Sequence, residues 1–532
     1  MIKIVTAGSF FSANIPAIIP DDTATPNWKR LINRADMLDA SSYPLESLKT
    51  ILSRENDRIG ADGKLLETID TVDNDTMFVL SGQQAGLFGG PLYTFYKAMH
   101  SIRLASRISE SSGKNVLPLF WIASDDHDFD EVKDLGIRTQ NGSEFRIEYK
   151  PKSYHEGMPV GDILIDDDIH EVIDLYEKNI FSGDRTQKYI EIIRNSWQPG
   201  TSWVNAFSAQ MVAMCSSYGL IIIDPRWQGI KKLYAHIMTE ELNNPLVSTG
   251  LINTEADTFE NSRKRRKALK KPADSTNLFV EFEGVRYPVR FDGTGFIAGS
   301  LRYSRTQILD MLRTSPELFS PGAALRPVCQ DFMLPVVATI GGPGERIYLS
   351  QIQPLYDFFN INASVVWPRA SFTIIDKRIT RTAEKEGIEL EKLFETPEKI
   401  RAELAYDSFP ENIMEKFDSL ENALKHGFDG LADSITALDS TLVQSVDKEK
   451  GKAIHMLEGL KERAIRAHKN SVNITDNRFT SAANYLRPSG GPQERWFGAD
   501  VVYSNFGEEN FKEFIKLTSP GEEHHRLIFP ED

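Results

Sequence analysis

Residues 77–105, MFVLSGQQAGLFGGPLYTFYKAMHSIRLA, constrain the fold more than any other segment. The apolar run at 77–80 predicts a buried strand. Apolar residues at helical spacing from Leu92 to Ile102 predict a helix, and Pro91 stands where its first residue is expected. Between them, residues 81–90 include glycines at 82, 86, 89 and 90. A strand, a glycine-rich turn and a helix in this order predict one unit of an α/β sheet.

The glycine-rich turn also predicts a binding site. Backbone N–H groups converge at such a turn, and the dipole of the following helix favours an anion there. The spacing is neither GxGxxG nor a Walker A loop, and glycines can also serve only to permit a tight turn. The expected substrate-binding residues are polar groups of this segment: Ser81, Gly82, Gln83, Gln84, Tyr93 and Lys97, with Lys97 supplying positive charge.

A second strand, at 116–123, runs directly into an acidic turn that contains Asp125, Asp126, His127 and Asp128. Ligands of open parallel sheets bind outside the carboxyl ends of the strands, so this turn and the glycine-rich turn predict one shared cleft. The carboxylates are expected to raise the pKa of His127. The cluster could deprotonate an amine, hold an ammonium group or bind a divalent cation, and capping of the next helix is the structural alternative. Asp125, Asp126 and His127 are the catalytic candidates.

Further buried strands are expected at 218–224, 335–340 and 364–367. The second of them is followed by a Gly-Gly-Pro-Gly-Glu turn, from which Gly341, Gly342 and Glu345 are expected to line the other side of the cleft. Glu345 falls in the first turn of a helix, where it could equally act as a cap. Residues 278–290, with Glu283 and Gly284 at the turn, predict a β-hairpin.

The region 376–472 has the pattern of a helical arm. Its apolar residues recur about every 3.7 positions from Ile413 to Val446, which is closer to hendecad than to heptad spacing. The pattern predicts a break near Asp447 and a return helix after it. A long antiparallel pair of helices cannot bury both of its faces alone, so a second copy of the chain, and hence a homodimer, is expected.

The composition excludes several classes of partner. The chain has 532 residues, 61 basic and 76 acidic, for a net charge of −15. A general nucleic-acid or membrane-surface binder needs a positive surface, so neither partner is expected, although the basic run at 263–271 could form a local patch or a solvated face. Cys215 and Cys329 are too few for a disulfide framework or a cysteine-rich zinc site, and Cys215 is expected to be buried. Without an apolar stretch of membrane length, a cytoplasmic location is expected.

Five segments together resemble one family, the bacillithiol biosynthesis cysteine-adding enzymes. The resemblance implies an α/β fold: a Rossmann-like parallel-sheet core with two insertions and a long antiparallel helical coiled-coil arm that dimerises. The segments are SGQQAGLFGGPLYT (81–94), FWIASDDHDFDEV (120–132), LRPVCQDFMLP (325–335), IGGPGERIY (340–348) and GGPQERW (490–496).

On this basis the core is expected in three parts, with connecting insertions between them and the arm behind. The expected boundaries are 1–139, 201–250 and 321–375 for the core, 140–200 and 251–320 for the insertions, 376–472 for the arm, and 473–532 for a C-terminal segment that packs on the core.

The resemblance also implies a reaction, the addition of cysteine to the amine of glucosaminyl malate in the last step of bacillithiol biosynthesis. Asp126 and His127 would orient and deprotonate that amine. ATP, with or without Mg²⁺, is the expected source of activation, through an adenylate or an acyl phosphate. The analogous mycothiol ligase is similar to cysteinyl-tRNA synthetase and uses a zinc-held thiol with HIGH and KMSKS motifs. Neither motif occurs in this chain, so no zinc is expected.

Two other functions remain open from the sequence. One is a dimeric nucleotide- or metabolite-binding scaffold that assists another ligase. The other is a nucleotidyltransferase that acts on a different small acid.

Overall fold

The structure, a computed structural model, describes residues 2–6, 27–139, 142–181, 183–262, 269–471, 476–518 and 525–530. The chain forms two compact units: residues 1–140, 144–376 and 490–532 make up the first, and residues 141–143 and 377–489 the second. Most of the basic run, residues 263–268, lies outside the described residues. Among the helices that are described, none combines the length and the apolar character needed to cross a membrane.

The first unit is built on a five-stranded parallel sheet with the strand order β13-β12-β2-β3-β6. Each of its strands falls on a segment predicted to be a buried strand, so these five predictions are confirmed. β2 stands in the middle, between β12 and β3, which places the glycine-rich turn at the centre of the sheet's carboxyl edge. The strands are β2 (Met77–Gln83), β3 (Val116–Ile122), β6 (Ile221–Ile223), β12 (Val336–Gly341) and β13 (Val365–Pro368).

Helices α2 (Trp28–Met37) and α5 (Leu92–Ser112) cover one face of this sheet and share a core cluster with β2, β3, β12 and β13. α5 is buried on nearly every side because a C-terminal helix, α22 (Phe511–Leu517), packs against it, with the rings of Phe95 and Phe511 5.3 Å apart. Pro91 is the residue that precedes α5 and not its first helical residue, a one-position correction to the prediction.

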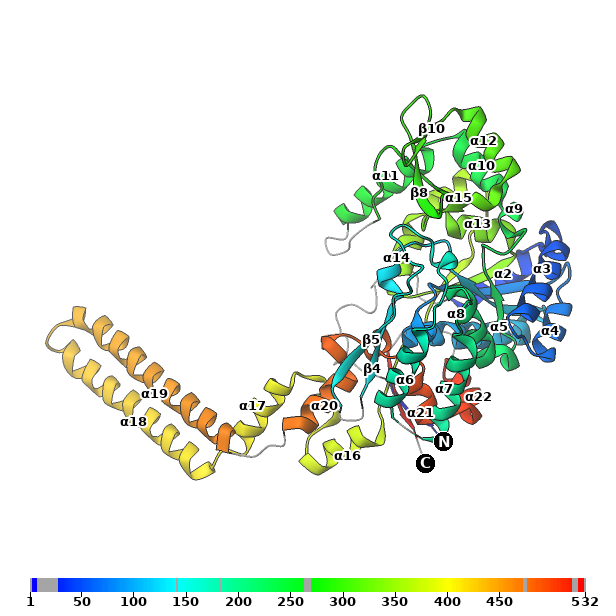
Figure 1. The fold of residues 1–532 in the computed structure, drawn as a ribbon. Helices are drawn as coiled ribbons and strands as arrows, with labels where there is room; N and C mark the ends of the chain where they lie inside the picture. The colour runs from blue at the N-terminus through cyan, green and yellow to red at the C-terminus, as the bar shows by residue number, and fades with distance from the viewer. Residues whose placement is uncertain are drawn as a thin grey trace. The chain divides into compact units, whose positions relative to one another are not determined.

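The outer edge of the sheet at β6 is closed by a side chain. Asn56, on α3 (Leu45–Arg58), donates to the carbonyl of Ile222 at 3.0 Å and accepts from its N–H at 3.1 Å. α3 and its neighbour α4 (Gly63–Asp70) lie side by side next to the sheet (Figure 1). The carboxamide therefore satisfies the backbone groups that an edge strand would leave unpaired.

A second, antiparallel sheet has the order β10-β9-β8-β7-β11. The predicted hairpin is confirmed, because β7 and β8 pair through a turn at Glu283 and Gly284, whose φ angles are 51° and 71°. Positive φ at both positions is typical of the tight type I′ hairpin turn. The strands are β7 (Ser275–Phe282), β8 (Val285–Phe291), β9 (Phe296–Ala298), β10 (Leu301–Tyr303) and β11 (Phe319–Pro321).

Residues 134–215 contain more helix than their polar composition suggests. β4 (Asp134–Arg138) and β5 (Glu144–Glu148) form a hairpin, and α6 (Ile169–Asn179), α7 (Asp184–Ser196) and α8 (Trp203–Cys215) follow. Trp197 and Trp203 pack edge to face, 5.1 Å apart, and are fully buried. Cys215, at the end of α8, is buried as predicted.

The C-terminal residues complete the first unit. β15 (Arg526–Pro530) lies between β1 (Ile2–Thr6) and β14 (Phe372–Ile374), antiparallel to the first and parallel to the second. Nearby, the guanidinium of Arg369 donates to both carboxylate oxygens of Glu494, at 2.5 and 2.9 Å, with both side chains buried. A buried, bidentate ion pair of this kind fixes the 490–496 segment against the core.

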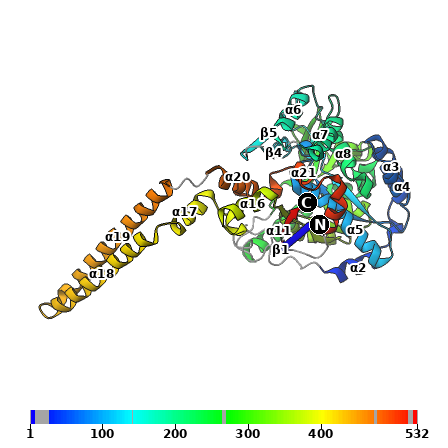
Figure 2. The ribbon, with the colours of Figure 1, turned by 90° about the horizontal axis from the view of Figure 1, so that it is seen from below.

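The second unit contains the arm, in which α18 (Glu411–Thr436) and α19 (Val443–Ser471) run side by side (Figures 1 and 2). The predicted pair of helices is present, but the predicted break near Asp447 is wrong. The turn comes earlier, at residues 437–442, where the Asp439 carboxylate accepts from the N–H of Thr441 and starts a short 3₁₀ turn. The cap therefore ends the helix, although apolar residues continue to recur at helical spacing through the turn.

The remaining helices of the second unit precede and follow the arm. They are α16 (Lys377–Glu386), α17 (Pro397–Asp407) and α20 (Asp476–Leu486).

Candidate functional site

A cavity of about 510 Å³ opens at the carboxyl ends of β2, β3 and β12. Its walls come from the glycine-rich turn, the acidic turn, α13 (Arg326–Met333) and α14 (Pro343–Gln351). The expected cleft between separate loops is therefore present. The predicted site residues that line it are Ser81, Gly82, Gln83, Gln84, Asp126 and Glu345.

Lys97 lies behind this wall, and its side chain is only 2% exposed. Its ammonium donates to the carbonyl of Gly82 at 2.8 Å, to Oε1 of Gln83 at 2.9 Å and to Oε1 of Glu345 at 2.8 Å. An ammonium has three donors, and all three are used. Burial lowers the pKa of Lys97, and Glu345 opposes that shift. Lys97 thus joins β2, the glycine-rich turn and α14, and it does not line the cavity.

Glu345 performs both of the roles that its sequence position allowed. Its Oε2 accepts from the N–H of Gly342 at 2.7 Å, which caps the start of α14, while the same carboxylate pairs with Lys97 and lines the cavity. Gly341 accepts from the N–H of Arg369 at 3.0 Å, so its carbonyl serves the backbone. Gly341 and Gly342 support the wall from behind.

Tyr93 lies at the start of α5, half buried, with the Arg369 guanidinium 5.8 Å from its ring centre. Burial raises the pKa of Tyr93. Its hydroxyl group is therefore protonated at neutral pH, and the structure places the residue outside the cavity lining.

Five N–H groups of the glycine-rich turn and the following helix start are not available to the predicted anion. These N–H groups donate to carbonyls of the protein instead, at 2.7–3.1 Å. The turn folds into a 3₁₀ segment whose residues Leu87 and Phe88 are completely buried under α8. The donors concerned are the N–H groups of Gly86, Leu87, Gly89, Gly90 and Leu92.

Asp126 meets two cations at the edge of the cavity. It accepts from Arg326, the first residue of α13, and from Arg286 on β8, the latter at 3.5 Å. The Arg286 side chain is buried and fixed by Ser320, which accepts from its Nε at 2.9 Å, and by the ring of Phe279 beneath it, 3.9 Å from the guanidinium carbon. The acidic turn therefore reaches the cavity as a neutralised cluster and not as a free anionic patch.

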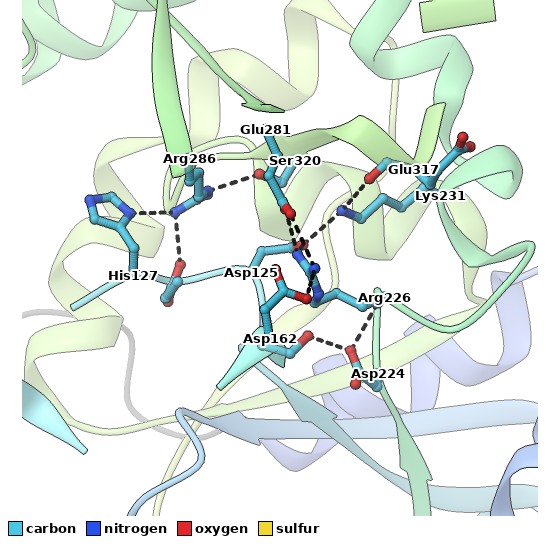
Figure 3. A network of polar contacts seen from close by, with 12 residues as sticks. Asp125, His127, Asp162, Asp224, Arg226, Lys231, Glu281, Arg286, Glu317 and Ser320 are labelled. Atoms are coloured by element: carbon cyan, nitrogen blue, oxygen red, sulfur yellow. Dashed lines mark hydrogen bonds and ion pairs between the residues drawn. The ribbon is translucent and has the colours of Figure 1, made fainter. Parts of the chain in front are cut away.

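Asp125 is not part of the cavity lining and belongs to a buried network of polar contacts (Figure 3). Lys231 donates to it at 2.7 Å, and the Arg226 guanidinium lies 3.6 Å away. Burial alone would raise the pKa of Asp125, but Lys231, Arg226 and Arg286 outweigh it and hold the pKa below its usual range. Arg226 also pairs with Asp162 at 2.5 Å and Glu281 at 2.8 Å, so Asp125 belongs to the support of the site.

His127 faces Arg286, whose Nη1 lies 3.4 Å from its Nδ1 (Figure 3). A guanidinium only donates, so Nδ1 is the acceptor and the neutral imidazole carries its proton on Nε2. The expected rise in pKa is wrong: burial and then Arg286 lower the pKa of His127, and these effects outweigh Asp126 and Asp128. At neutral pH the ring is therefore uncharged.

Several residues of the site were not predicted, because they reach it only through tertiary folding. Arg286 comes from the second sheet and Arg326 from the start of α13, far from either turn in sequence. Trp121 lies in the 120–132 segment and Arg326 and Gln330 in the 325–335 segment, both of which carry part of the family resemblance. The sequence around the other residues gives no local signal of a site. The unpredicted residues are Trp121, Arg226, Lys231, Arg286, Arg326 and Gln330.

Comparison with known proteins decides the family. The profile described as "Bacillithiol biosynthesis BshC, N-terminal Rossmann-like domain" matches residues 22–370, and "Bacillithiol biosynthesis BshC, C-terminal coiled-coil domain" matches residues 372–530. The chain belongs to the bacillithiol biosynthesis BshC family. The expected fold, a Rossmann-like α/β core with a helical coiled-coil arm, is thereby confirmed.

Relatives in this BshC family carry the name "Putative cysteine ligase BshC". The protein of Salinibacter ruber is 29% identical over 481 residues, which cover 88% of this chain and 86% of the relative. That of Chloroherpeton thalassium is 28% identical and covers 92% and 89%. That of Staphylococcus aureus strain MRSA252 is 27% identical and covers 84% and 83%.

The five segments that carry the BshC resemblance have two different positions in the structure. Those at 81–94, 120–132, 325–335 and 340–348 all contribute to the cavity. The segment at 490–496 does not, because Gln493 hydrogen-bonds the backbone of Ile374 and Glu494 pairs with Arg369. Four segments thus build the site, and the fifth holds the chain behind it.

Gly82→Ala should destabilise the protein by about 1–3 kcal/mol, the usual cost of overpacking. A Cβ at Gly82 would lie 2.6 Å from the backbone oxygen of Trp121 on the neighbouring strand, so β2 and β3 would have to separate. Urea unfolding monitored by circular dichroism measures the effect.

Gly250→Ala on α11 (Val247–Ser262) is the matched control, since a Cβ there meets nothing within 4 Å. It should leave stability unchanged or raise it by up to about 1 kcal/mol, the difference in helix propensity. Equal stability of the two variants would show that the close approach of β2 and β3 is not rigid.

Proposed function

We propose that this protein is a ligase that joins the carboxyl group of cysteine to the amine of glucosaminyl malate, the last step of bacillithiol biosynthesis, in the cytoplasm. The observation that carries the proposal is the single cavity on which four family segments converge, at the edge of the sheet where parallel α/β proteins bind ligands. The name shared by the relatives supports a cysteine ligase.

The charges of the cavity suit these substrates. Carboxylates of Asp126, Glu131 and Glu345 and the guanidinium of Arg326 line one hollow, together with apolar side chains. Both proposed substrates carry an amine as well as carboxylate groups, so each requires acceptors and donors within one site. The apolar part of the lining would accommodate the thiol of cysteine, which is weakly polar.

An amide forms when the amine attacks an activated carboxyl carbon and loses a proton. We assign the amine to Asp126, whose carboxylate lines the cavity. We assign the proton to Nδ1 of the adjacent His127, which lies outside the lining and must give up its 3.4 Å contact with Arg286 to accept it. His127 is suited to this step because its lowered pKa leaves it uncharged at neutral pH. Amide formation in water requires an activated carboxyl group, and ATP is the proposed source of that activation.

Incubation of the purified protein with ATP, cysteine and glucosaminyl malate tests the proposal. Mass spectrometry should detect the thiol amide, with one ATP consumed for each amide formed. Tight binding of the substrates without turnover would instead indicate a scaffold for another ligase. Pyrophosphate release with a different small acid would indicate a nucleotidyltransferase.

The matched variant for this experiment is His127→Ala. If the imidazole takes the proton, kcat/KM should fall about 10²–10⁴-fold, the usual contribution of general base catalysis. Its thermal unfolding should stay close to wild type, because the His127 side chain is only half buried and makes one long hydrogen bond and one ring contact, with Phe279. Full activity of the variant would remove this residue from the proposed mechanism.

Arg286→Gln should move the acidic limb of the pH profile of kcat/KM to higher pH. Burial and Arg286 lower the pKa of His127, whereas Asp126 and Asp128 raise it, so loss of the cation lets the pKa rise toward or above its usual value. The wild-type imidazole stays neutral, and active as a base, to a lower pH than the variant. Initial rates measured across the acidic pH range give the acidic limb for the wild type and for the variant.

Arg290→Gln is the control for that profile, because Arg290 lies on the same strand but is exposed and pairs with Asp274. Its limb should coincide with wild type. An acidic limb that stays in place in Arg286→Gln would mean that a group other than His127 titrates.

We also propose that the arm forms a homodimer with a second copy of the chain. α18 buries none of its residues within one chain, and apolar side chains remain exposed on both helices of the arm. Ion pairs such as Lys461–Asp418, at 3.0 Å, join α18 to α19. The exposed apolar side chains of the two helices are therefore available to a partner. The exposed apolar residues include Ile413, Leu420, Leu431, Met456 and Leu460.

Lysine at both Leu420 and Leu431, which are 50% and 48% exposed, should convert the dimer into a monomer, because charge cannot be buried in an apolar contact. Sedimentation equilibrium measures the mass. The double variant Ser419→Lys and Ser434→Lys adds the same charge at exposed polar positions of α18 and should remain dimeric. A wild-type chain that sediments as a monomer would contradict the proposal.

A further inference from the structure

The floor of the cavity contains a buried donor that the protein itself does not use. Trp121, on β3, lines the cavity and is 2% exposed. Its indole Nε1 has no hydrogen-bond partner among the residues that the structure describes. An unmade hydrogen bond at a buried donor costs about 1–3 kcal/mol, so such groups usually find a partner. The indole ring borders the cavity, so a ligand bound there is the available source of that partner.

Gly82 opens the space beside this indole. In the parallel register, Gly82 of β2 lies opposite Trp121 of β3, on the same face of the sheet. A Cβ at this position would stand 3.2 Å from the Cβ of Trp121. Because Gly82 has no side chain, nothing from β2 covers the Cβ end of the Trp121 side chain. Gly82 and Trp121 both line the cavity.

A second polar group of the lining is also uncommitted. Gln330, on α13, is 7% exposed and lines the same cavity. Its backbone carbonyl accepts from Leu334, but within the described part of the chain its carboxamide makes no hydrogen bond. The nearby cation Arg326 lines the cavity as well and is already paired with Asp126. Both groups, like the hydroxyl of Ser81, thus remain for a ligand.

We propose that Trp121 and Gln330 form a binding subsite for a carbonyl or carboxylate oxygen of the substrate, with Trp121 as a specificity-determining residue. An indole N–H can only donate, so the group it binds must be an acceptor. The carboxamide of Gln330 adds a donor and an acceptor, which suits an oxygen-rich group. The inference rests on the proposed function for the identity of the substrates, since the acceptor can belong to cysteine or to glucosaminyl malate.

Trp121→Phe removes the N–H and keeps an aromatic ring. KM for the substrate that carries the acceptor should rise about 5–20-fold, the loss of one hydrogen bond, while kcat changes less than about 2-fold. KM for the other substrate should not change, so separate titrations of cysteine and glucosaminyl malate identify the source of the oxygen. Gln330→Met, a variant of similar length, should raise KM for the same substrate.

Trp367→Phe is the matched control. Trp367 lies on β13 of the same sheet, is equally buried and has an unpaired Nε1, but it does not line the cavity. Both tryptophan variants lose similar packing volume, and only Trp121→Phe should change KM. Equal KM values for Trp121→Phe, Gln330→Met and wild type would overturn the subsite.

Calorimetric titration with each substrate separates this result from failure of the proposed function. If the wild type binds a substrate without turning it over, the ligase proposal fails, whereas a weaker Kd in Trp121→Phe alone still supports the subsite. If wild type, Trp121→Phe and Trp367→Phe bind with the same Kd, or none of them binds, the subsite is refuted.

Discussion

The site depends above all on one buried ammonium group. Lys97 holds the end of β2 through the Gly82 carbonyl, the glycine-rich turn through Gln83, and the start of α14 through Glu345. β2 and the turn are continuous in sequence, whereas Glu345 lies 248 residues after Lys97. A charge buried at this depth is tolerated only with full pairing. The geometry of the cavity wall is therefore set from behind, by a residue that a ligand does not need to touch.

The opposite wall is organised by the same principle with the charges reversed. Asp125 and Asp126 are adjacent in sequence but have different environments. Asp125 pairs with Lys231 in a buried network, and Asp126 pairs with Arg326 at the cavity. Arg286 links Asp126 to His127 and is itself fixed on the second sheet. The antiparallel sheet thus contributes to the chemistry of the parallel one by placing a cation beside its acidic turn.

Local pattern was enough to predict the strands of the parallel sheet, the β7–β8 hairpin and the meeting of two turns at one edge, since each depends on short-range periodicity and on the geometry of parallel strands. Prediction from local pattern failed where the structure depends on contacts with residues distant in sequence or on local capping. The glycine-rich turn resembles an anion site, but five N–H groups of the turn and the following helix start donate to protein carbonyls. The pKa of His127 moves opposite to the expectation because burial and then Arg286, 159 residues away, outweigh the adjacent carboxylates. The end of α18 was misplaced because a cap at Asp439 interrupts a continuing apolar period.

The carboxamide of Asn56 has a consequence for assembly. By occupying the backbone donor and acceptor of Ile222, it prevents a strand from another molecule from extending the sheet at β6. Growth by strand addition, the usual route to fibrous aggregates, is blocked at that border by a single planar group that imitates a peptide bond. Self-association of this chain is thereby directed away from that edge of the sheet.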